Sequence, residues 1–167
     1  MTKQLSIVKG MTIDKALRHF NGYTQLDNGQ IAVAKYYGAL PPAENWEMKF
    51  TFKNSIVFGY GVDKHGADTN LTYTHVEVEV NKLLYSPYFG SPTAKLQHAK
   101  GGWRKWEVDT KGVDSWHLVE EDSAILTIGK QGFEHEKLVV LAERLREAFR
   151  QTMVLVCDTQ GNVTEIY

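Results

Sequence analysis

An imidazole and two carboxylates recur at every second position of segment 71–80, which reads LTYTHVEVEV. If the segment is a strand, His75, Glu77 and Glu79 share one face in a row, with roughly 7 Å between neighbours. Such a row could supply two ligands of a divalent metal, or a general acid and a general base for a hydrolase or a lyase. No third metal ligand stands at a recognisable offset, so we predict no metal site. The polar outer face of a half-exposed strand is the competing interpretation.

The span 80–106 contains five basic residues and no Asp or Glu, so its formal charge is +5, whereas the rest of the chain sums to −6. Tyrosine and tryptophan side chains are interleaved with these basic residues. Together they could neutralise phosphates and stack against bases or other planar groups. The span therefore predicts a site for an anionic, partly planar ligand, such as a nucleotide or a nucleic-acid segment. The ligand-binding residues expected there are Tyr88, Lys100, Trp103, Arg104, Lys105 and Trp106.

The two faces of a strand expected at 103–108 limit this site. Trp103 and Lys105 would face one way, whereas Arg104 and Trp106 would face the other. All four side chains cannot contact one ligand, and we expect at least one of the two tryptophans to lie in the core. A solvated basic loop over an aromatic core is the competing interpretation.

The sequence Gly129-Lys130-Gln131-Gly132, between an expected strand and an expected helix, predicts a second candidate anion site. Amide groups at a helix N-terminus have no intrahelical acceptor and the helix dipole favours negative charge, so two glycines and a lysine there could hold a phosphate. The spacing differs from that of a P-loop. Two glutamates in the first helical turn would repel such a ligand, which favours an ordinary helix start.

No motif in the chain identifies a reaction or a cofactor. The remaining histidines share no spacing. The single cysteine, Cys157, lies in the apolar run MVLVC, which is typical of a buried and unreactive thiol. Whether the protein is an enzyme therefore depends on how the fold assembles these side chains.

Segments that alternate between apolar and polar residues predict the strands that would position these groups. Segment 46–53 alternates most regularly, and its Trp, Met and Phe side chains are expected on a buried face. Asn54 and Ser55 could close a tight hairpin into a strand at 56–62, and 71–80 would complete a three-stranded antiparallel meander. The other expected strands are 31–37, 103–108, 115–119, 123–128, 152–157 and 162–167. Turns are expected at Asn28-Gly29, at Lys111-Gly112, around 121–122 and around 158–161, the last within a C-terminal hairpin. Segment 81–102 is expected to be a long loop with one helical turn around 93–100.

Two helices are expected. A short one covers 12–20, with Thr12 as its N-cap, and a long one covers 133–150, where apolar residues recur at helical spacing. We therefore predict a single α+β domain over residues 1–167: a mainly antiparallel sheet of roughly six to nine strands, which can be strongly curved, with one long C-terminal helix packed on it and a short N-terminal helix. In an alternative, strand 123–128, the long helix and strand 152–157 form a parallel crossover.

The composition bounds the function classes. The chain has 167 residues, is 43% hydrophobic and 23% charged, and carries a net charge of −1, which excludes a polybasic protein and restricts any nucleic-acid contact to a local surface. No apolar run reaches the length of a membrane span and no signal peptide is evident, so we expect a cytoplasmic protein without a membrane partner.

Three hypotheses follow, from different classes. The first is a small binding protein for an anionic, partly planar ligand, using the residues of the acid-free span. The second is a hydrolase or lyase at His75, Glu77 and Glu79, which predicts a concave pocket and a perturbed pKa at that place. The third is an inhibitor or accessory protein that binds a protein partner, for which an exposed apolar patch would be the signal.

Overall fold

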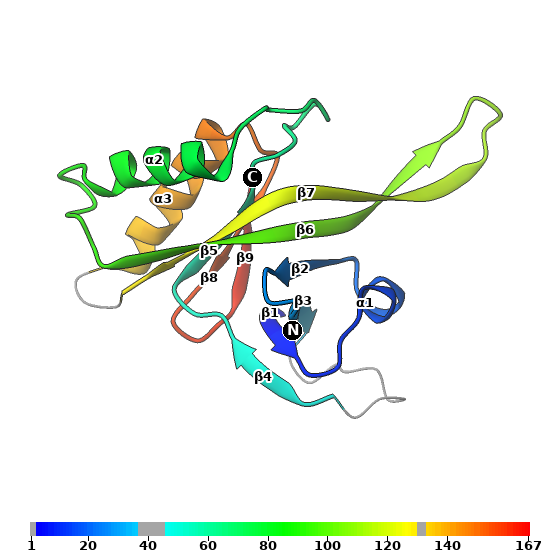
Figure 1. Cartoon of the computed structure of the whole chain (residues 1–167), viewed down its shortest axis with the longest axis horizontal. Coiled ribbons are helices and arrows are strands. Elements are labelled where there is room, and N and C mark those ends of the chain that lie inside the picture. Colours follow the sequence, from blue (N-terminus) through cyan, green and yellow to red (C-terminus); the bar gives the residue numbers. More distant parts are fainter. Residues whose placement is uncertain (1–2, 37–45, 130–132) are drawn as a thin grey trace.

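A computed structural model describes residues 3–36, 46–129 and 133–167, where nine strands form one antiparallel sheet that carries three helices (Figure 1). The strands are β1 (Lys3–Val8), β2 (Gly22–Leu26), β3 (Ile31–Tyr36), β4 (Met48–Thr51), β5 (Ser55–Gly59), β6 (Ala94–Val108), β7 (Asp114–Ile128), β8 (Val154–Cys157) and β9 (Val163–Ile166). The helices are α1 (Ile13–His19), α2 (Tyr73–Leu84) and α3 (His135–Ala148). The strand order is β4-β1-β3-β2-β6-β7-β5-β8-β9.

The sheet curls into a barrel. Only residues 52–54 separate β4 from β5, although these strands lie in opposite halves of the strand order, so the two halves must approach each other. At the other closing point Gln4 of β1 forms an isolated antiparallel bridge with Asn162, and Lys3 Nζ lies 3.3 Å from Oε1 of Glu165 on β9. The strands therefore have an inner and an outer face.

The inner face holds a core made from strands that are far apart in sequence. Register places Ile7 opposite Ala32, Leu26 opposite Ala99 and Val57 opposite Ile125 on this face. The cluster is formed by Leu5, Ile7, Leu26, Ala32, Phe52, Val57, Ala99, Ile125 and Cys157. Burial raises the pKa of the Cys157 thiol to about 12, in keeping with the unreactive thiol that its apolar surroundings predict.

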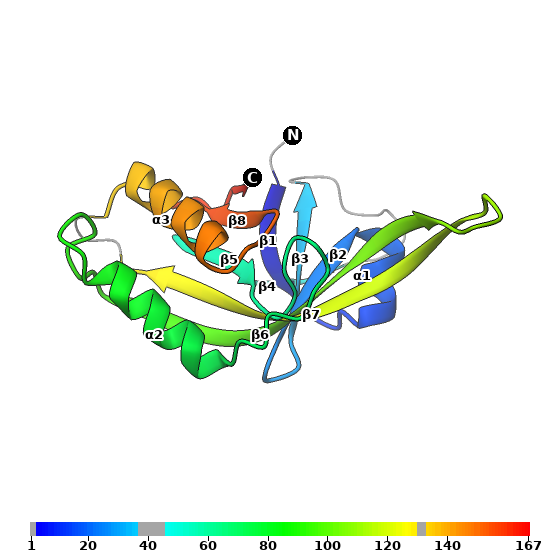
Figure 2. The same ribbon diagram turned by 90° about the horizontal axis from the view of Figure 1, so that it is seen from above.

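The outer face is covered by the three helices. Helix α1 packs Ala16 and Leu17 over β1, β2 and β3, while α2 and α3 cover β5, β7 and β8 (Figure 2). The prediction of one long C-terminal helix packed on the sheet is wrong, because α3 has 14 residues and shares its face with the 12-residue α2. The short N-terminal helix and the N-cap at Thr12, which accepts a hydrogen bond from the Lys15 amide, are confirmed.

Helix α2 replaces the strand predicted at 71–80. Thr72 caps it in a capping box with His75, whose Nδ1 lies 3.3 Å from the Thr72 amide. Val76, Val80 and Leu84, spaced four residues apart, are buried against the outer face of the sheet. Packing of this helical stripe thus outweighs the β propensity of the Thr and Val residues.

The longest elements of the fold are β6 and β7, which pair over 15 residues each. The loop predicted at 81–102 is confirmed only for residues 85–93, because 81–84 belong to α2 and 94–102, where one helical turn was expected, belong to β6. The turn predicted around 121–122 is the middle of β7. The turn expected at Lys111-Gly112 is confirmed: Asp109 Oδ1 accepts hydrogen bonds from the amides of Lys111 and Val113, and Gly112 has φ +77°. The outer half of this hairpin, residues 103–119, projects beyond the rest of the molecule and is called the arm (Figures 1 and 2).

Three other predictions on the sheet are corrected. The meander is absent, because β4 pairs with β1 and β5 pairs with β7 and β8. The parallel crossover is also wrong, since every strand pair in the described residues is antiparallel. The apolar face of 46–53 is not a core face throughout: Met48 and Phe50 are exposed on the edge strand β4, and Phe52 is buried. The hairpins predicted around Asn28-Gly29 and around 158–161 are confirmed.

Candidate functional site

The residues that the sequence singled out at 75–79 do not form a site in α2. Successive helical residues turn by 100°, so Glu77 points away from the side shared by His75 and Glu79. The shared face predicted for the three side chains is therefore wrong. His75 is occupied in the capping box, and His75 and Glu77 are exposed. In the described residues no group of three or more His, Cys, Asp or Glu side chains could hold a metal ion.

Two of the five basic residues of the acid-free span form ion pairs, one with an acid of the neighbouring strand β7 and one with an acid further along β6. Lys100 Nζ lies 3.3 Å from Oδ1 of Asp122, and Lys105 Nζ lies 3.3 Å from Oε1 of Glu107. β7 carries the run 120–122, Glu-Glu-Asp, opposite residues 100–102 of this span. The local excess of positive charge along the sequence is thus balanced in part by acids that lie close in space.

The aromatic members of the predicted ligand site are spread over the molecule. Trp103 and Trp106 face opposite ways, as the strand period predicts, but both are exposed, so the expectation of a core tryptophan is wrong. Tyr88 lies after α2, far from the arm in sequence, with the Arg144 guanidinium 5.5 Å from its ring centre. The structure does not bring the six predicted residues together.

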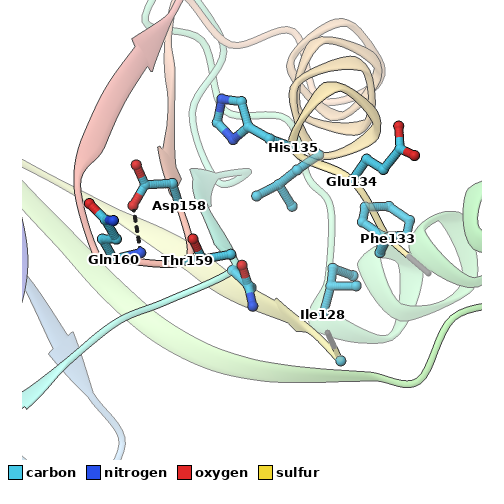
Figure 3. Close-up of a pocket in the computed structure, with 10 residues that line it drawn as sticks. Ile128, Phe133, Glu134, His135, Asp158, Thr159 and Gln160 are labelled. Atoms are coloured by element: carbon cyan, nitrogen blue, oxygen red, sulfur yellow. Dashed lines mark hydrogen bonds between the residues drawn. The ribbon is translucent and has the colours of Figure 1, made fainter. Parts of the chain in front are cut away.

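The predicted phosphate loop is described only at Gly129, whose amide donates to the carbonyl oxygen of Thr93 at 2.7 Å. Lys130, Gln131 and Gly132 lie outside the described residues. A pocket of 290 Å³ lies beside Gly129, between the start of α3 and the turn that joins β8 to β9 (Figure 3). Glu134 and Asp158 stand on its walls and place negative charge there.

A larger cavity, of 410 Å³, opens at one end of the barrel, next to the inner core. Small residues face inward at its walls: Gly22, Thr24, Ala34, Gly59, Gly101 and Ser123. Leu5, Val57, Leu155 and Met153 add apolar surface, and the Trp103 indole also lines the opening. Ligand sites of proteins commonly have this volume and occupy the mouths of barrels.

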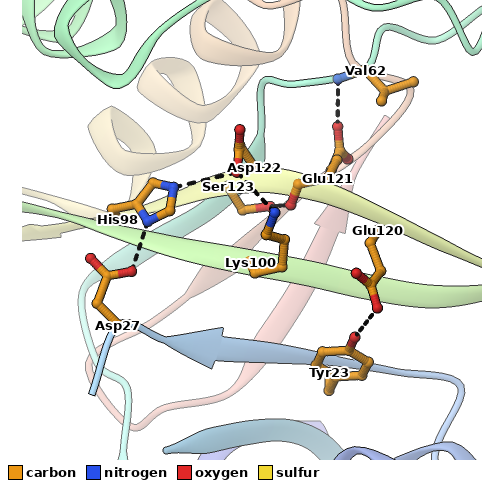
Figure 4. A network of polar contacts seen from close by, with 9 residues as sticks. All are labelled: Tyr23, Asp27, Val62, His98, Lys100, Glu120, Glu121, Asp122 and Ser123. Atoms are coloured by element: carbon orange, nitrogen blue, oxygen red, sulfur yellow. Dashed lines mark hydrogen bonds and ion pairs between the residues drawn. The ribbon is translucent and has the colours of Figure 1, made fainter. Parts of the chain in front are cut away.

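Glu121 is the buried ionisable residue of this cavity, with 8% of its surface exposed. Its Oε2 accepts a hydrogen bond of 3.0 Å from the Val62 amide (Figure 4). Burial raises the pKa of this carboxyl to about 7, the Val62 amide acts in the opposite direction, and neighbouring Asp122 raises it further. The group therefore changes charge near neutral pH.

Two glycines leave the space that the Glu121 carboxyl and the Ser123 hydroxyl occupy. A Cβ atom on Gly59 would lie 2.1 Å from Oε1 of Glu121, and one on Gly101 would lie 2.7 Å from Oγ of Ser123. Ser123 Oγ in turn donates to the carbonyl oxygen of Glu121 at 3.2 Å. The position of the Glu121 carboxyl therefore requires the absence of a side chain at residue 59.

A second polar group lies on the outer face of β6 and β7 (Figure 4). His98 Nδ1 is 2.7 Å from Oδ1 of Asp27, and its Nε2 is 3.5 Å from Oδ1 of Asp122, which also pairs with Lys100. Carboxylates contact both ring nitrogens, so His98 connects Asp27, at the end of β2, to the β6–β7 hairpin. For the same reason His98 is poorly placed to take a proton from a substrate.

Tyr23 forms a separate contact on this face. Its Oη donates to Glu120 at 3.1 Å, and burial together with this carboxylate raises the tyrosine pKa to about 12.

The arm has one apolar and one polar face. Trp106 lies opposite Trp116, and Leu118 lies opposite Arg104, whose guanidinium is 4.9 Å from the centre of the Trp116 ring. We call the four exposed apolar side chains of this face the apolar arm face: Trp106 (66% exposed), Val108 (65%), Trp116 (44%) and Leu118 (37%). The opposite face carries Lys105, Glu107 and His117 in mutual contact.

Comparison of the chain with protein-family models, with curated proteins and with solved structures gives no match. Among the described residues no helix has the length and apolarity needed to cross a membrane. Inferences about function therefore rest on the cavity and on the arm.

Sequence reasoning missed Glu121, His98 and the pairing of Trp106 with Trp116. One feature of the sequence indicates close packing around this part of β6: the glycine pair 101–102 within a run rich in lysine and tryptophan. Glycines inside a strand often mark close approach of a neighbour, and a Cβ atom on Gly102 would lie 2.4 Å from the Tyr23 ring.

Proposed function

We propose that this protein is an accessory protein that acts by binding another protein through the apolar arm face. The observation that carries the proposal is the pair Trp106 and Trp116, held opposite each other on a projecting hairpin and exposed to solvent. Tryptophan and arginine side chains are enriched among the residues that dominate the energy of protein interfaces. A contiguous apolar surface of this kind is typical of an interaction site.

The charge of the arm supports a protein partner. Residues 103–119 contain three basic residues, Arg104, Lys105 and Lys111, and three acidic residues, Glu107, Asp109 and Asp114, which gives a net charge of zero with neutral histidine. Nucleic-acid sites depend on an excess of cations that neutralise phosphates. A surface without net charge and with aromatic anchors instead resembles a protein interface.

The nucleotide or nucleic-acid ligand stays a prediction with one supporting observation. Arg104 lies over the Trp116 ring, next to Trp106, so a guanidinium and two indoles form a surface on which a planar anion could stack. Binding of labelled single-stranded DNA, RNA and nucleotides at low salt, measured by fluorescence anisotropy, tests it. Strong binding that the double charge reversal Arg104→Glu and Lys105→Glu abolishes would favour this function over the proposed one.

Site-specific photo-crosslinking tests the proposed function most directly. Benzoylphenylalanine would replace Trp106 in one variant and Glu107, on the opposite face of the same strand, in a matched control, in cells that make the protein naturally. We expect one specific protein to be crosslinked from position 106 and not from position 107. Equal labelling from both positions, crosslinking to nucleic acid alone, or no crosslink from position 106 would contradict the proposal.

Sedimentation velocity then shows whether the partner is a second copy of the chain. If the apolar arm face binds another copy, the purified protein associates at micromolar concentration and Trp106→Ala returns it to a monomer. If the partner is a different protein, the purified protein is a monomer and binds the partner identified by crosslinking. The variant Lys105→Ala, on the polar face of the arm, serves as the control in both cases.

A further inference from the structure

We propose that the mouth of the barrel is a binding site for a small, mainly apolar amine, held by an ion pair between its ammonium group and the carboxylate of Glu121. The site is separate from the apolar arm face and takes a ligand of different chemistry. Its cavity of 410 Å³ lies within the range of volumes that small-molecule sites occupy.

The apolar part of the ligand is inferred from the cavity walls. Leu5, Val57 and Leu155 face the cavity from three strands, and the Met153 side chain and the Trp103 indole complete the lining. Inward-facing glycine, alanine and threonine elsewhere on the wall leave the space open. An aliphatic or aromatic body of modest size would bury its surface here and gain free energy in proportion to the area removed from water.

The ammonium group of the ligand is inferred from the Glu121 carboxyl, which has no cationic partner in the described part of the chain. Among the described residues the only hydrogen bond to the side chain of Glu121 comes from the Val62 amide to Oε2, which leaves Oε1 without a donor. No ion pair joins Glu121 to a cationic side chain of the described residues, and Lys3, which lines the cavity, lies 3.3 Å from Glu165. Ionising a largely buried carboxyl that has one neutral hydrogen-bond donor and no cationic partner is costly, and a ligand cation would lower that cost.

Glu121 itself sets the charge that a ligand meets inside the cavity. Asp122, its neighbour on β7, pairs with Lys100 on the outer face, Glu165 lies at the rim beside Lys3, and His19 lines the cavity with its ring 5.3 Å from that of Trp46. A carboxylate or phosphate ligand would meet Glu121 directly and be repelled. An ammonium group donates charge-assisted hydrogen bonds, which are about twice as strong as neutral ones.

Three ligands that differ only in the head group test the proposal: n-octylamine, n-octanol and octanoate. Isothermal titration calorimetry would be performed at about pH 8, above the pKa of Glu121 and below that of an alkyl amine. We expect the amine to bind at least about tenfold more tightly than the alcohol, and octanoate not to bind. Shortening the amine should weaken binding by about fourfold per methylene if the chain is buried.

Two variants disturb the Glu121 carboxylate in different ways, one by removing its charge and one by displacing it. Glu121→Gln abolishes its charge, and Gly59→Ala introduces a Cβ atom where Oε1 now lies. Both should reduce the preference for octylamine over octanol to about threefold or less, while octanol still binds. Glu107→Gln, which removes an exposed carboxyl on the arm, should change nothing, and Trp106→Ala should leave amine binding intact, which separates this site from the proposed function.

Proton competition supplies a readout on the unaltered protein in case a variant fails to fold. Because the amine requires the ionised carboxyl, its affinity should fall by about tenfold between about pH 8 and pH 6, whereas the affinity of octanol should not change. The proposal is overturned if octylamine and octanol bind equally, if neither binds, or if a folded Glu121→Gln variant keeps the preference for the amine.

Discussion

The two halves of the β6–β7 hairpin differ in what covers them. In the half that belongs to the barrel, Ala99 and Ile125 face the inner core while Ala124 and Leu126 lie beneath α2 and α3. In the arm, the same two strands continue beyond the rest of the sheet, and Trp106 and Trp116 are exposed on one face. The arm therefore leaves two large aromatic side chains open to solvent, whereas the barrel half is packed on both faces.

That distribution is the reverse of what stability alone would favour, since burying a tryptophan contributes more than burying an alanine. The barrel half uses small residues because neighbours approach closely, as the glycines at 59, 101 and 102 show. The arm half uses large residues that remain available to another molecule. The barrel half thus packs both of its faces within the chain, and the arm leaves exposed the aromatic face that we propose to bind a partner.

The largest expected difference between the two halves is in stability. Ile125→Ala, at a fully buried inner position, should lower the free energy of unfolding by about 2–5 kcal/mol. Trp106→Ala should lower it by less than about 1 kcal/mol, because only a cross-strand contact with Trp116 is lost. Urea unfolding followed by circular dichroism measures both. If Trp106→Ala cost as much as Ile125→Ala, the arm would be part of the structural core.

Glu121 should give the barrel a pH dependence that the arm lacks. Because burial raises its pKa from 4.5 to about 7, the folded protein holds this proton more tightly than the unfolded chain does. The resulting stability is fully present below pH 4.5 and is lost as the pH rises through 7, a change of up to about 3 kcal/mol at 1.4 kcal/mol per pKa unit. Unfolding free energies of the wild type and of Glu121→Gln across this range measure it, and a constant difference between the two would contradict the assignment.

Partner binding should distinguish the two faces of the arm. Trp106→Ala should weaken the complex with the crosslinked partner by about 2 kcal/mol or more, the usual loss at a residue that dominates an interface. Lys105→Ala should change the affinity by less than about 0.5 kcal/mol, since the residue lies on the polar face in an exposed ion pair. Surface plasmon resonance measures both. Equal losses would show that the partner surrounds the arm and does not bind its apolar face.

The smallest effect is expected at the contact between Asp27 and His98. Asp27→Asn removes a carboxylate from an ion pair in which the aspartate is largely exposed, so the free energy of unfolding should fall by less than about 1 kcal/mol. Thermal unfolding at low and high salt measures the loss, and salt should reduce it. A large, salt-independent loss would show that this contact holds the barrel together.

The elements that were predicted correctly from the sequence are those specified by residues close to one another in the chain. Helix α1, the Asn28-Gly29 turn, the turn at Lys111-Gly112 and the C-terminal hairpin have caps or turn residues that specify them directly. The antiparallel sheet with helices was also predictable from alternation. These features depend on residues that lie within a few positions of each other.

Features that depend on distant contacts could not be predicted in this way. The pattern at 71–80 fits a strand by its Thr and Val residues, and only the outer face of the barrel selects the helical stripe Val76, Val80 and Leu84. The positive span looked like an anion site because its acidic neighbours come later in the chain, on β7. The sequence around Glu121 is typical of a turn, and the burial of this residue depends on Gly59 and Val62, which are about 60 positions away in the chain.

The closure of the barrel determines which parts of the fold form early and which form late. Gln4 donates to the Gln160 carbonyl across 156 positions, and Lys3 meets Glu165 across 162, so the cavity exists only after the two ends of this sequence have found each other. Such distant contacts form slowly, whereas a hairpin of neighbouring strands closes within microseconds. The hairpin that carries the apolar arm face therefore forms before the barrel is complete, and together with the open inner face of the sheet it exposes apolar side chains to premature association during synthesis.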